Sequence, residues 1–204
     1  MINIKAIIFD LGNVLIDYSF HRAFHKWAEL TLHPQDFFAS QFQYDETLWQ
    51  FERGQITPRE YYQYLSQSMQ ITWDYDMFKQ GWIFVNIGLI QEMVALLPIL
   101  SEKFSLYVLS NTNELHIESV KHEFPQIFRY FKQEFYSHEL SARKPDAEIY
   151  DKVIQMINLP PHEILFIDDM EENIRGAERA GIHGIVMSSA TELKQELVKL
   201  GILD

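Results

Sequence analysis

Residues 7–17 read IIFDLGNVLID and hold both the first strand signal and the first candidate functional residue. Residues 7–9 form an apolar run rich in β-branched side chains, which is typical of a buried strand. Asp10 follows at once, and the chain then turns at Gly12. A carboxylate at the end of a buried strand is costly to desolvate unless it has a partner. Asp10 is therefore either a turn-capping residue or a carboxylate held for chemistry, such as a covalent nucleophile.

Apolar runs and helical patterns alternate along most of the chain. Runs that predict buried strands lie at 6–9, 106–109, 164–167 and 184–187, with a weaker one at 133–136. Helical periodicity lies between them, at 90–103, 114–124, 147–157, 172–180 and 190–200. Strands that alternate with helices are typical of βαβ units, so we predict an α/β fold with a doubly wound parallel sheet.

Residues 18–88 interrupt this alternation. They show no clear strand but contain most of the aromatic residues of the chain, and Phe20 and Phe24 fall at helical spacing. A further helix is predicted from 58, with Thr57 as N-cap and Glu60 completing a capping box. We therefore predict two domains, a core of residues 1–17 and 89–204 and a helical cap of residues 18–88.

Composition excludes several classes of protein. The formal net charge of −12 argues against nucleic acid as a partner and requires local positive charge wherever a phosphate ester binds. The chain has no cysteine, which suits a reducing cytosol, so we expect a cytoplasmic protein. Asp10 interrupts the first apolar stretch, and no run approaches the ~20 residues needed to cross a bilayer, so neither a signal peptide nor a membrane span is expected.

Three of the strong apolar runs end in polar side chains. Asp10 follows the first run, Ser110 and Asn111 follow the second, and Asp168 and Asp169 follow the third. Because the carboxyl ends of parallel strands meet at one edge of a sheet, we expect these side chains to face one ligand site.

Each polar segment has a chemical and an ordinary interpretation. Ser110 and Asn111, in LSNTN, can hold an anion with backbone N–H groups or simply cap a helix. Lys144, in SARKPD, can neutralise phosphate and carboxylate charge or be a solvated lysine. The adjacent acids Asp168 and Asp169 favour a hard cation such as Mg²⁺, one binding directly and the other through water, with helix-capping acids as the alternative.

Taken together, the segments FDLGNV, LSNTN, RKPD and IDDMEEN resemble the motifs of the haloacid dehalogenase superfamily of aspartate-nucleophile hydrolases, in the same order. The 18–88 insert sits where subfamily IA members carry a helical C1 cap. The resemblance implies a Rossmann-like core and a Mg²⁺-dependent phosphatase of small phosphorylated metabolites that works through an aspartyl-phosphate.

The resemblance also implies roles for individual residues. Asp10 would be the nucleophile and a metal ligand, and Gly12 would bind the metal through its carbonyl. Ser110 and Asn111 would bind phosphoryl oxygens, and Lys144 would bridge the phosphate and the nucleophile. Asp169, with Asp168, would bind Mg²⁺.

Gly12 departs from the usual pattern of the family's phosphatases, which carry a general acid and base at this position. Such a group contributes roughly 10²–10⁴ in rate. The DLGNV variant resembles the branch that contains α-D-glucose-1-phosphate phosphatases, which predicts a hexose 1-phosphate as substrate, and an anomeric oxygen leaves more easily than an ordinary alkoxide. Asp17 and His21 are candidate replacements for the acid.

The sequence is also compatible with other functions. Metal-free haloacid dehalogenation by Asp10 is disfavoured because the acids Asp168 and Asp169 would repel a carboxylate substrate. The loss of an acid at Gly12 leaves open a catalytically weak phosphate-binding or regulatory protein, and a slow phospho-aspartate would suit a mutase. The pair His21 and His25 has zinc-like spacing but neither an intervening Glu nor an obvious third ligand.

Overall fold

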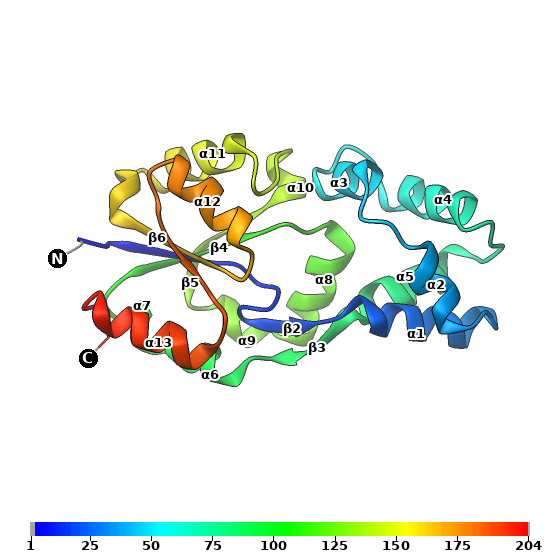
Figure 1. The fold of residues 1–204 in the computed structure, drawn as a ribbon, viewed down its shortest axis with the longest axis horizontal. Helices are drawn as coiled ribbons and strands as arrows, with labels where there is room; N and C mark the ends of the chain where they lie inside the picture. The colour runs from blue at the N-terminus through cyan, green and yellow to red at the C-terminus, as the bar shows by residue number, and fades with distance from the viewer. Residues whose placement is uncertain (1–2, 204) are drawn as a thin grey trace.

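The computed structural model describes residues 3–203 (Figure 1). Its strands are β1 (Ala6–Phe9), β2 (Ile16–Tyr18), β3 (Asn86–Leu89), β4 (Ser105–Ser110), β5 (Phe131–Tyr136), β6 (Ile164–Asp168) and β7 (His183–Val186). The helices of the first half are α1 (Phe20–Thr31), α2 (Gln35–Gln41), α3 (Glu46–Glu52), α4 (Pro58–Ser68) and α5 (Tyr75–Trp82), followed by the 3-10 turn η1 (Ile83–Val85). Those of the second half are α6 (Gln91–Val94), α7 (Leu96–Ser101), α8 (Glu114–Glu123), α9 (Pro125–Phe128), α10 (Ser137–Leu140), α11 (Ala147–Ile157), η2 (Pro161–Glu163), α12 (Glu171–Arg179) and α13 (Ala190–Lys199).

The main sheet has five parallel strands in the order β5-β4-β1-β6-β7. β1 lies at its centre, where Ile7 is opposite both Leu106 of β4 and Leu165 of β6. Helices α11 and α12 cover one face, and α6, α7 and α13 cover the other (Figure 1). The predicted α/β fold with a doubly wound, Rossmann-like parallel sheet is confirmed.

Burial on both faces explains the continuous apolar runs in the strands. Alternate residues of β1 point to opposite sides: Ile7 and Phe9 belong to one core cluster, and Ala6 and Ile8 to the other. All four are fully buried. Since the strand tips are held by two layers of side chains, the residues that follow them are placed on a rigid edge.

The helix predicted over 90–103 is two short helices, α6 and α7, separated at Ala95. Pro98 explains the break, because it has no N–H to donate to the carbonyl of Val94 and its ring crowds that carbonyl. The other predicted strands and helices of the sheet end within two residues of the observed ones.

Helices α1–α5 form what we call the helical insert (residues 20–82), at the end of the molecule away from both termini (Figure 1). Its core is aromatic, and its fully buried rings are those of Trp27, Phe38, Phe51, Tyr61, Phe78 and Trp82. At the start of α4, Thr57 Oγ1 accepts from the Glu60 N–H, and Glu60 Oε2 accepts from the Thr57 N–H at 2.7 Å. The predicted capping box is confirmed.

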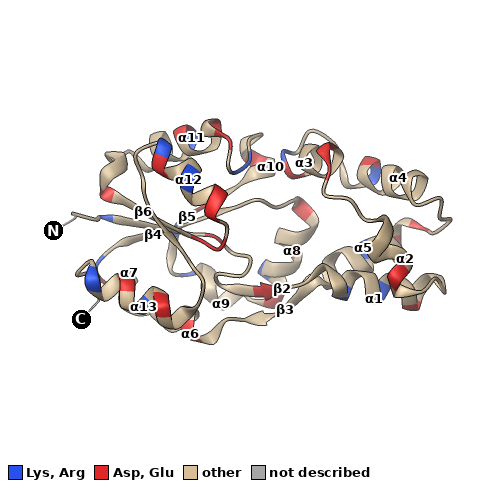
Figure 2. Ribbon diagram, in the orientation of Figure 1, with Lys and Arg blue, Asp and Glu red and all other residues tan. Residues whose placement is uncertain are grey.

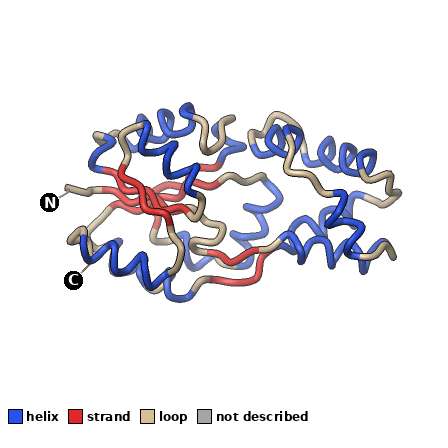
Figure 3. The backbone as a smooth tube through the Cα atoms, in the orientation of Figure 1, coloured by secondary structure: helices blue, strands red, loops and turns tan. Residues whose placement is uncertain are grey.

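Two strands lie partly inside the stretch for which no strand was predicted. β2 and β3 pair antiparallel, with Asp17 opposite Gly88, and lead the chain into and out of the helical insert (Figure 3). The prediction that 18–88 lacks strands was wrong at its two ends. Each strand is too short to show a period-two pattern, and its partner lies far away in sequence.

Side-chain contacts also join the insert to the sheet. Arg143 Nε lies 3.0 Å from Glu52 Oε2 of α3. On the other side, the Trp82 ring of α5 stacks on His116 of α8 with centroids 4.8 Å apart, and Trp82 Nε1 donates to Asn113 Oδ1 at 3.2 Å. These contacts hold the insert against the edge of the sheet at which the polar strand ends gather.

The acidic residues counted in the net charge lie on both parts of the molecule and include the loop between β6 and α12 (Figure 2). No helix within residues 3–203 combines the length and the apolar character that a bilayer crossing requires.

Candidate active site

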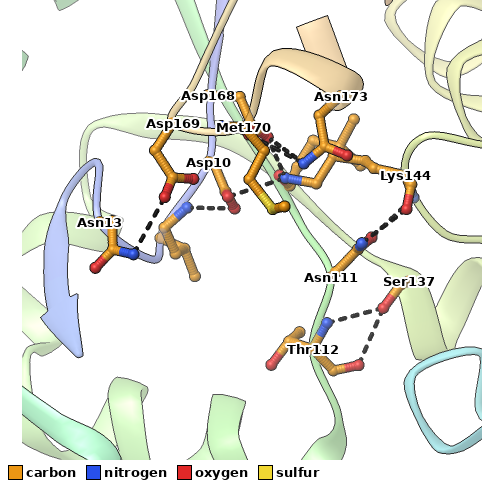
Figure 4. Close-up of polar contacts among 12 residues, drawn as sticks. Asp10, Asn13, Asn111, Thr112, Ser137, Lys144, Asp168, Asp169, Met170 and Asn173 are labelled. Carbon is orange, nitrogen blue, oxygen red and sulfur yellow. Dashed lines mark hydrogen bonds and ion pairs between the residues drawn. The ribbon is translucent and has the colours of Figure 1, made fainter. Parts of the chain in front are cut away.

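Polar side chains from three strand ends meet at the carboxyl edge of the main sheet (Figure 4). Lys144 Nζ lies 3.0 Å from Asp10 Oδ2 and 2.6 Å from Asp168 Oδ2. Lys144 comes from the loop between α10 and α11, so three segments distant in sequence converge on one ammonium group. The structure brings together the residues that the strand pattern placed at this edge.

Lys144 is buried, with 1% of its surface exposed. Besides the two carboxylates, its Nζ donates to the Leu109 carbonyl at 3.0 Å, so all three of its protons have acceptors. Burial alone would lower the pKa of Lys144, but Asp10 and Asp168 outweigh burial and raise that pKa above its usual value. Lys144 is therefore a fixed positive charge and not a solvated surface lysine.

Asp168 is held by donors on both oxygens. Oδ1 accepts from the Met170 N–H at 2.8 Å and from Asn173 Nδ2 at 3.0 Å. Oδ2 accepts from Lys144 at 2.6 Å and from Asn173 Nδ2 at 3.1 Å. Since Asp168 is fully buried, these contacts make it the group that orients Lys144. Asn173 was not predicted as a site residue. Its position on the first turn of the helix after the two acids was the available indication.

Asp169 is only partly buried and faces the cavity described below. Its Oδ2 accepts from Asn13 Nδ2 at 3.1 Å (Figure 4). Asn13 has a φ of 53°, in the left-handed region that asparagine tolerates better than most residues. Burial raises the pKa of Asp169. Asn13 was a missed site residue, although its place in the DLGN turn was the available signal.

Asp10 is 9% exposed, and its Oδ1 accepts from the Leu11 N–H at 2.7 Å. Burial raises the pKa of Asp10 to about 7; Lys144 lowers this pKa, and the charge of Asp168 raises it. A second positive charge at this edge would favour the ionised carboxylate, which is the form a nucleophile requires.

Ser110 and Asn111 have different contacts. Asn111 Oδ1 accepts from the Lys144 N–H at 2.8 Å, and Asn111 Nδ2 donates to the Lys144 carbonyl at 2.9 Å. The Asn111 side chain thus fixes the backbone of Lys144. The Ser110 hydroxyl lines the cavity and has no hydrogen-bond partner among residues 3–203, which leaves it available to a ligand.

A further pair of residues braces the loop after β4. Ser137 Oγ accepts from the Thr112 N–H at 2.9 Å and donates to the Thr112 carbonyl at 3.0 Å. Ser137 is fully buried and gave no sequence signal, since its partner lies 25 residues away.

A cavity of about 590 Å³, which we call the main cavity, opens above the strand ends. The sheet side is polar and includes Asp10, Asn13, Ser110, Lys144 and Asp169. The helical insert and β2 supply a mostly aromatic wall that includes Tyr18, Phe20, Tyr44, Trp49, Glu52 and Trp82. A polar floor under an aromatic wall suits a small ligand with an anionic group at one end.

Gly12 lies directly beneath the ring of Tyr18. A Cβ at position 12 would be 2.6 Å from Tyr18 Cε1 and 3.0 Å from Cδ1, closer than carbon atoms approach, so the ring occupies the space of a side chain there. Burial, followed by the charges of Asp10 and Asp169, raises the pKa of Tyr18 well above its usual value, so its hydroxyl keeps its proton.

The two candidate replacements for the missing acid lie elsewhere. Asp17 is exposed on β2, and neither it nor His21 lines the main cavity. His21 lines a smaller hollow of about 390 Å³ beside the main cavity, together with Tyr18.

Three carboxylates at this edge fit a divalent cation. One oxygen each of Asp10, Asp168 and Asp169 lies within 4.8 Å of the other two. Hard oxygen donors are the ligands that Mg²⁺ prefers. Lys144 offsets only part of the negative charge of the three acids, so a dication would also relieve their repulsion.

A parallel sheet with a carboxylate at its central strand tip defines the class of α/β enzymes whose chemistry lies at the carboxyl edge. The family model described as haloacid dehalogenase-like hydrolase matches residues 4–181, and the chain belongs to this family. It is thus a hydrolase, as the sequence resemblance predicted.

Several proteins similar to this chain are phosphatases. The chain is 26% identical over 200 residues to D-ribitol-5-phosphate phosphatase of Bacteroides thetaiotaomicron, covering 95% of this chain and 97% of the relative. It is 25% identical over 202 residues to a sesquiterpene phosphatase of Aspergillus oryzae, with 96% of each covered. A crystal structure of a haloacid dehalogenase family enzyme from B. thetaiotaomicron, in complex with magnesium and inorganic phosphate, superposes with a TM-score of 0.80 at 30% identity and covers 90% of this chain and 93% of that one.

Proposed function

We propose that this protein is a Mg²⁺-dependent phosphatase of small phosphorylated metabolites, with hexose 1-phosphates as its expected substrates. The observation that carries the proposal is the position of Asp10, at the tip of the central strand, facing the main cavity and 3.0 Å from the buried Lys144. The phosphatases among its relatives support the reaction class. We further propose that residues 18–88 act as a cap domain over the core of residues 1–17 and 89–204.

In this mechanism an Asp10 carboxylate oxygen attacks phosphorus, and the ester P–O bond breaks with its electron pair going to the leaving oxygen. Water then attacks the phosphorus of the aspartyl-phosphate, the bond between phosphorus and the Asp10 oxygen breaks with its electron pair going to the carboxylate, and inorganic phosphate leaves with the protons of the water. Lys144 neutralises charge shared by Asp10 and the phosphoryl group, and Ser110 donates its hydroxyl to a phosphoryl oxygen. Asn111 lines the same cavity and would bind the phosphoryl group through its backbone N–H, since its side chain is hydrogen-bonded to the backbone of Lys144.

Asp10, Asp169 and the Gly12 carbonyl would hold Mg²⁺, with Asp168 beside them. The contacts favour Asp169 over Asp168 as the direct ligand, because Asp168 is fully buried and accepts from donors on both oxygens, whereas Asp169 accepts from Asn13 and faces the cavity. When bound, the ion supplies Lewis-acid stabilisation of the phosphoryl charge.

Phosphatase activity should depend on Mg²⁺ and disappear in excess chelator. Asp169→Asn should raise the Mg²⁺ concentration needed for half-maximal activity by at least about tenfold, within the effect expected for a disturbed metal site. Ca²⁺ should inhibit, because its larger and more flexible coordination shell misplaces the phosphoryl group. Glu171→Gln is the matched control, since Glu171 is an exposed acid two residues further on that pairs with Arg175. Full activity in chelator would contradict the metal site.

The identity of the leaving group should strongly affect the rate. Without an acid at Gly12, the departing oxygen receives no proton from that position, so p-nitrophenyl phosphate and glucose 1-phosphate should exceed glucose 6-phosphate in kcat/KM by at least about tenfold. Ribitol 5-phosphate, the substrate named for one relative, belongs in the same panel. Equal rates on the two glucose phosphates would mean that another group supplies the proton. Turnover of a 2-haloacid without metal would support the dehalogenase alternative.

A further inference from the structure

The strand that leads into the helical insert, β2, places an aromatic ring over the turn that follows Asp10. Tyr18, the last residue of β2, places its ring edge above Gly12, with Cζ 3.6 Å from the position of a Cβ there. An acid at position 12 would extend into the space that the Tyr18 ring occupies. Tyr18 therefore brings its hydroxyl to the region of the site where a side chain at residue 12 would otherwise lie.

Tyr18 is also open to a ligand. It lines both the main cavity and the smaller hollow, and 38% of its surface is exposed. Its ring packs edge-on against Phe20, with centroids 6.2 Å apart. The hydroxyl has no hydrogen-bond partner within the described part of the chain. A donor without a partner in the protein is available for a hydrogen bond with a ligand.

We propose that the Tyr18 hydroxyl donates a hydrogen bond to the leaving oxygen of the phosphate ester, in place of the acid that position 12 lacks. This rests on the proposed phosphatase function. As Asp10 Oδ bonds to phosphorus, the ester P–O bond breaks and its electron pair moves to the leaving oxygen. The Tyr18 O–H stabilises that charge and keeps its own proton, and the alcohol takes its proton from water. Stabilisation without proton transfer is compatible with a rate that still depends on the leaving group.

The test compares Tyr18→Phe with wild type on two esters, p-nitrophenyl phosphate and glucose 6-phosphate, at saturating Mg²⁺. Tyr18→Phe keeps the ring over Gly12 and removes only the hydroxyl. We expect the alkyl ester to lose about a hundredfold in kcat, as when one donor to a developing oxyanion is removed. The aryl ester should lose less than about threefold, because its leaving group needs little stabilisation. Tyr44→Phe, which removes a hydroxyl from a neighbouring ring of the same wall, should keep the wild-type ratio between the esters.

A second comparison uses the Gly12→Asp background, in which the Tyr18 ring must shift to admit the new side chain and we expect the carboxylic acid to serve the leaving oxygen. There, adding Tyr18→Phe should no longer change the ratio between the two esters. Equal losses on both esters in Tyr18→Phe, or no loss, would overturn the role of Tyr18 while leaving the phosphatase function intact. A wild-type protein that turns over neither ester, nor any other in the panel, would overturn both.

Discussion

Asp10→Asn should abolish phosphatase turnover, with a loss of at least about 10⁴-fold, the scale seen when the central group of a catalytic set is removed. An amide has nearly the shape of the carboxylate but cannot attack phosphorus. The fold should persist, because Lys144 keeps Asp168 at 2.6 Å and the Leu109 carbonyl at 3.0 Å. The measurement is initial rate on p-nitrophenyl phosphate, with thermal unfolding recorded in parallel.

The matched control for this variant is Asp17→Asn. Asp17 belongs to the same opening segment but is exposed on β2 and does not line the main cavity. It should retain wild-type turnover. Residual activity above about 1% in Asp10→Asn, in a folded protein, would show that Asp10 is not the nucleophile.

Lys144→Met should give a large loss of stability in addition to a loss of activity. The variant keeps most of the length of the side chain but leaves Asp10 and Asp168 as two buried carboxylates without their cation. Removing one partner of a buried ion pair costs about 3–5 kcal/mol. Urea denaturation in chelator, where no bound cation offsets the two charges, measures the free energy of unfolding. Lys199→Met, which removes an exposed lysine paired with Glu196, should change it by less than about 0.5 kcal/mol.

The loss of unfolding free energy in Lys144→Met, relative to wild type, should increase with pH. Burial raises the folded-state pKa of Asp10 to about 7, above its value of 3.8 in the unfolded chain, and Lys144 is the main group that lowers it. A raised carboxyl pKa means that the folded state binds more protons, so stability falls as pH rises until the folded pKa is passed. In wild type this fall levels off above about pH 7; without Lys144 the pKa is higher still and the fall continues. A deficit that is the same below and above pH 7 would contradict this account.

The sequence predicted the site best where it depends on the ends of strands. Asp10, Ser110 and Asp168 each follow an apolar run directly, and Asp169 comes next, so the strand pattern alone puts them on one edge of the sheet. Lys144 lies in a loop whose composition is typical of the surface, and its burial arises only when Asp10 and Asp168 converge on it. The sequence around Lys144 does not predict these contacts, because they form only in the folded protein.

Other features depend on contacts that the local sequence pattern does not show. The contact of the Tyr18 ring with Gly12 requires the turn of the chain between them, and the pairing of Asp17 with Gly88 requires the whole insert to fold back. The reciprocal hydrogen bonds between Asn111 and Lys144 likewise join two loops. For Asp17 and Asn111 the partner lies far along the chain, and for Tyr18 it lies across a turn, so the residue type alone did not identify the contact.

The central position of β1 has a consequence for the order in which the chain can fold during synthesis. β1 is made early, but Ile7 pairs with Leu106 and Leu165, which are made much later. Contacts between distant residues form slowly, because closing the long intervening chain costs entropy before the contacts contribute any stability. The helices of the insert instead find most of their packing partners within the insert itself, which is made before β4 and β6. During synthesis the AIIF strand therefore remains unpaired until β4 and β6 have been made, and an unpaired apolar strand is open to aggregation and to chaperone binding.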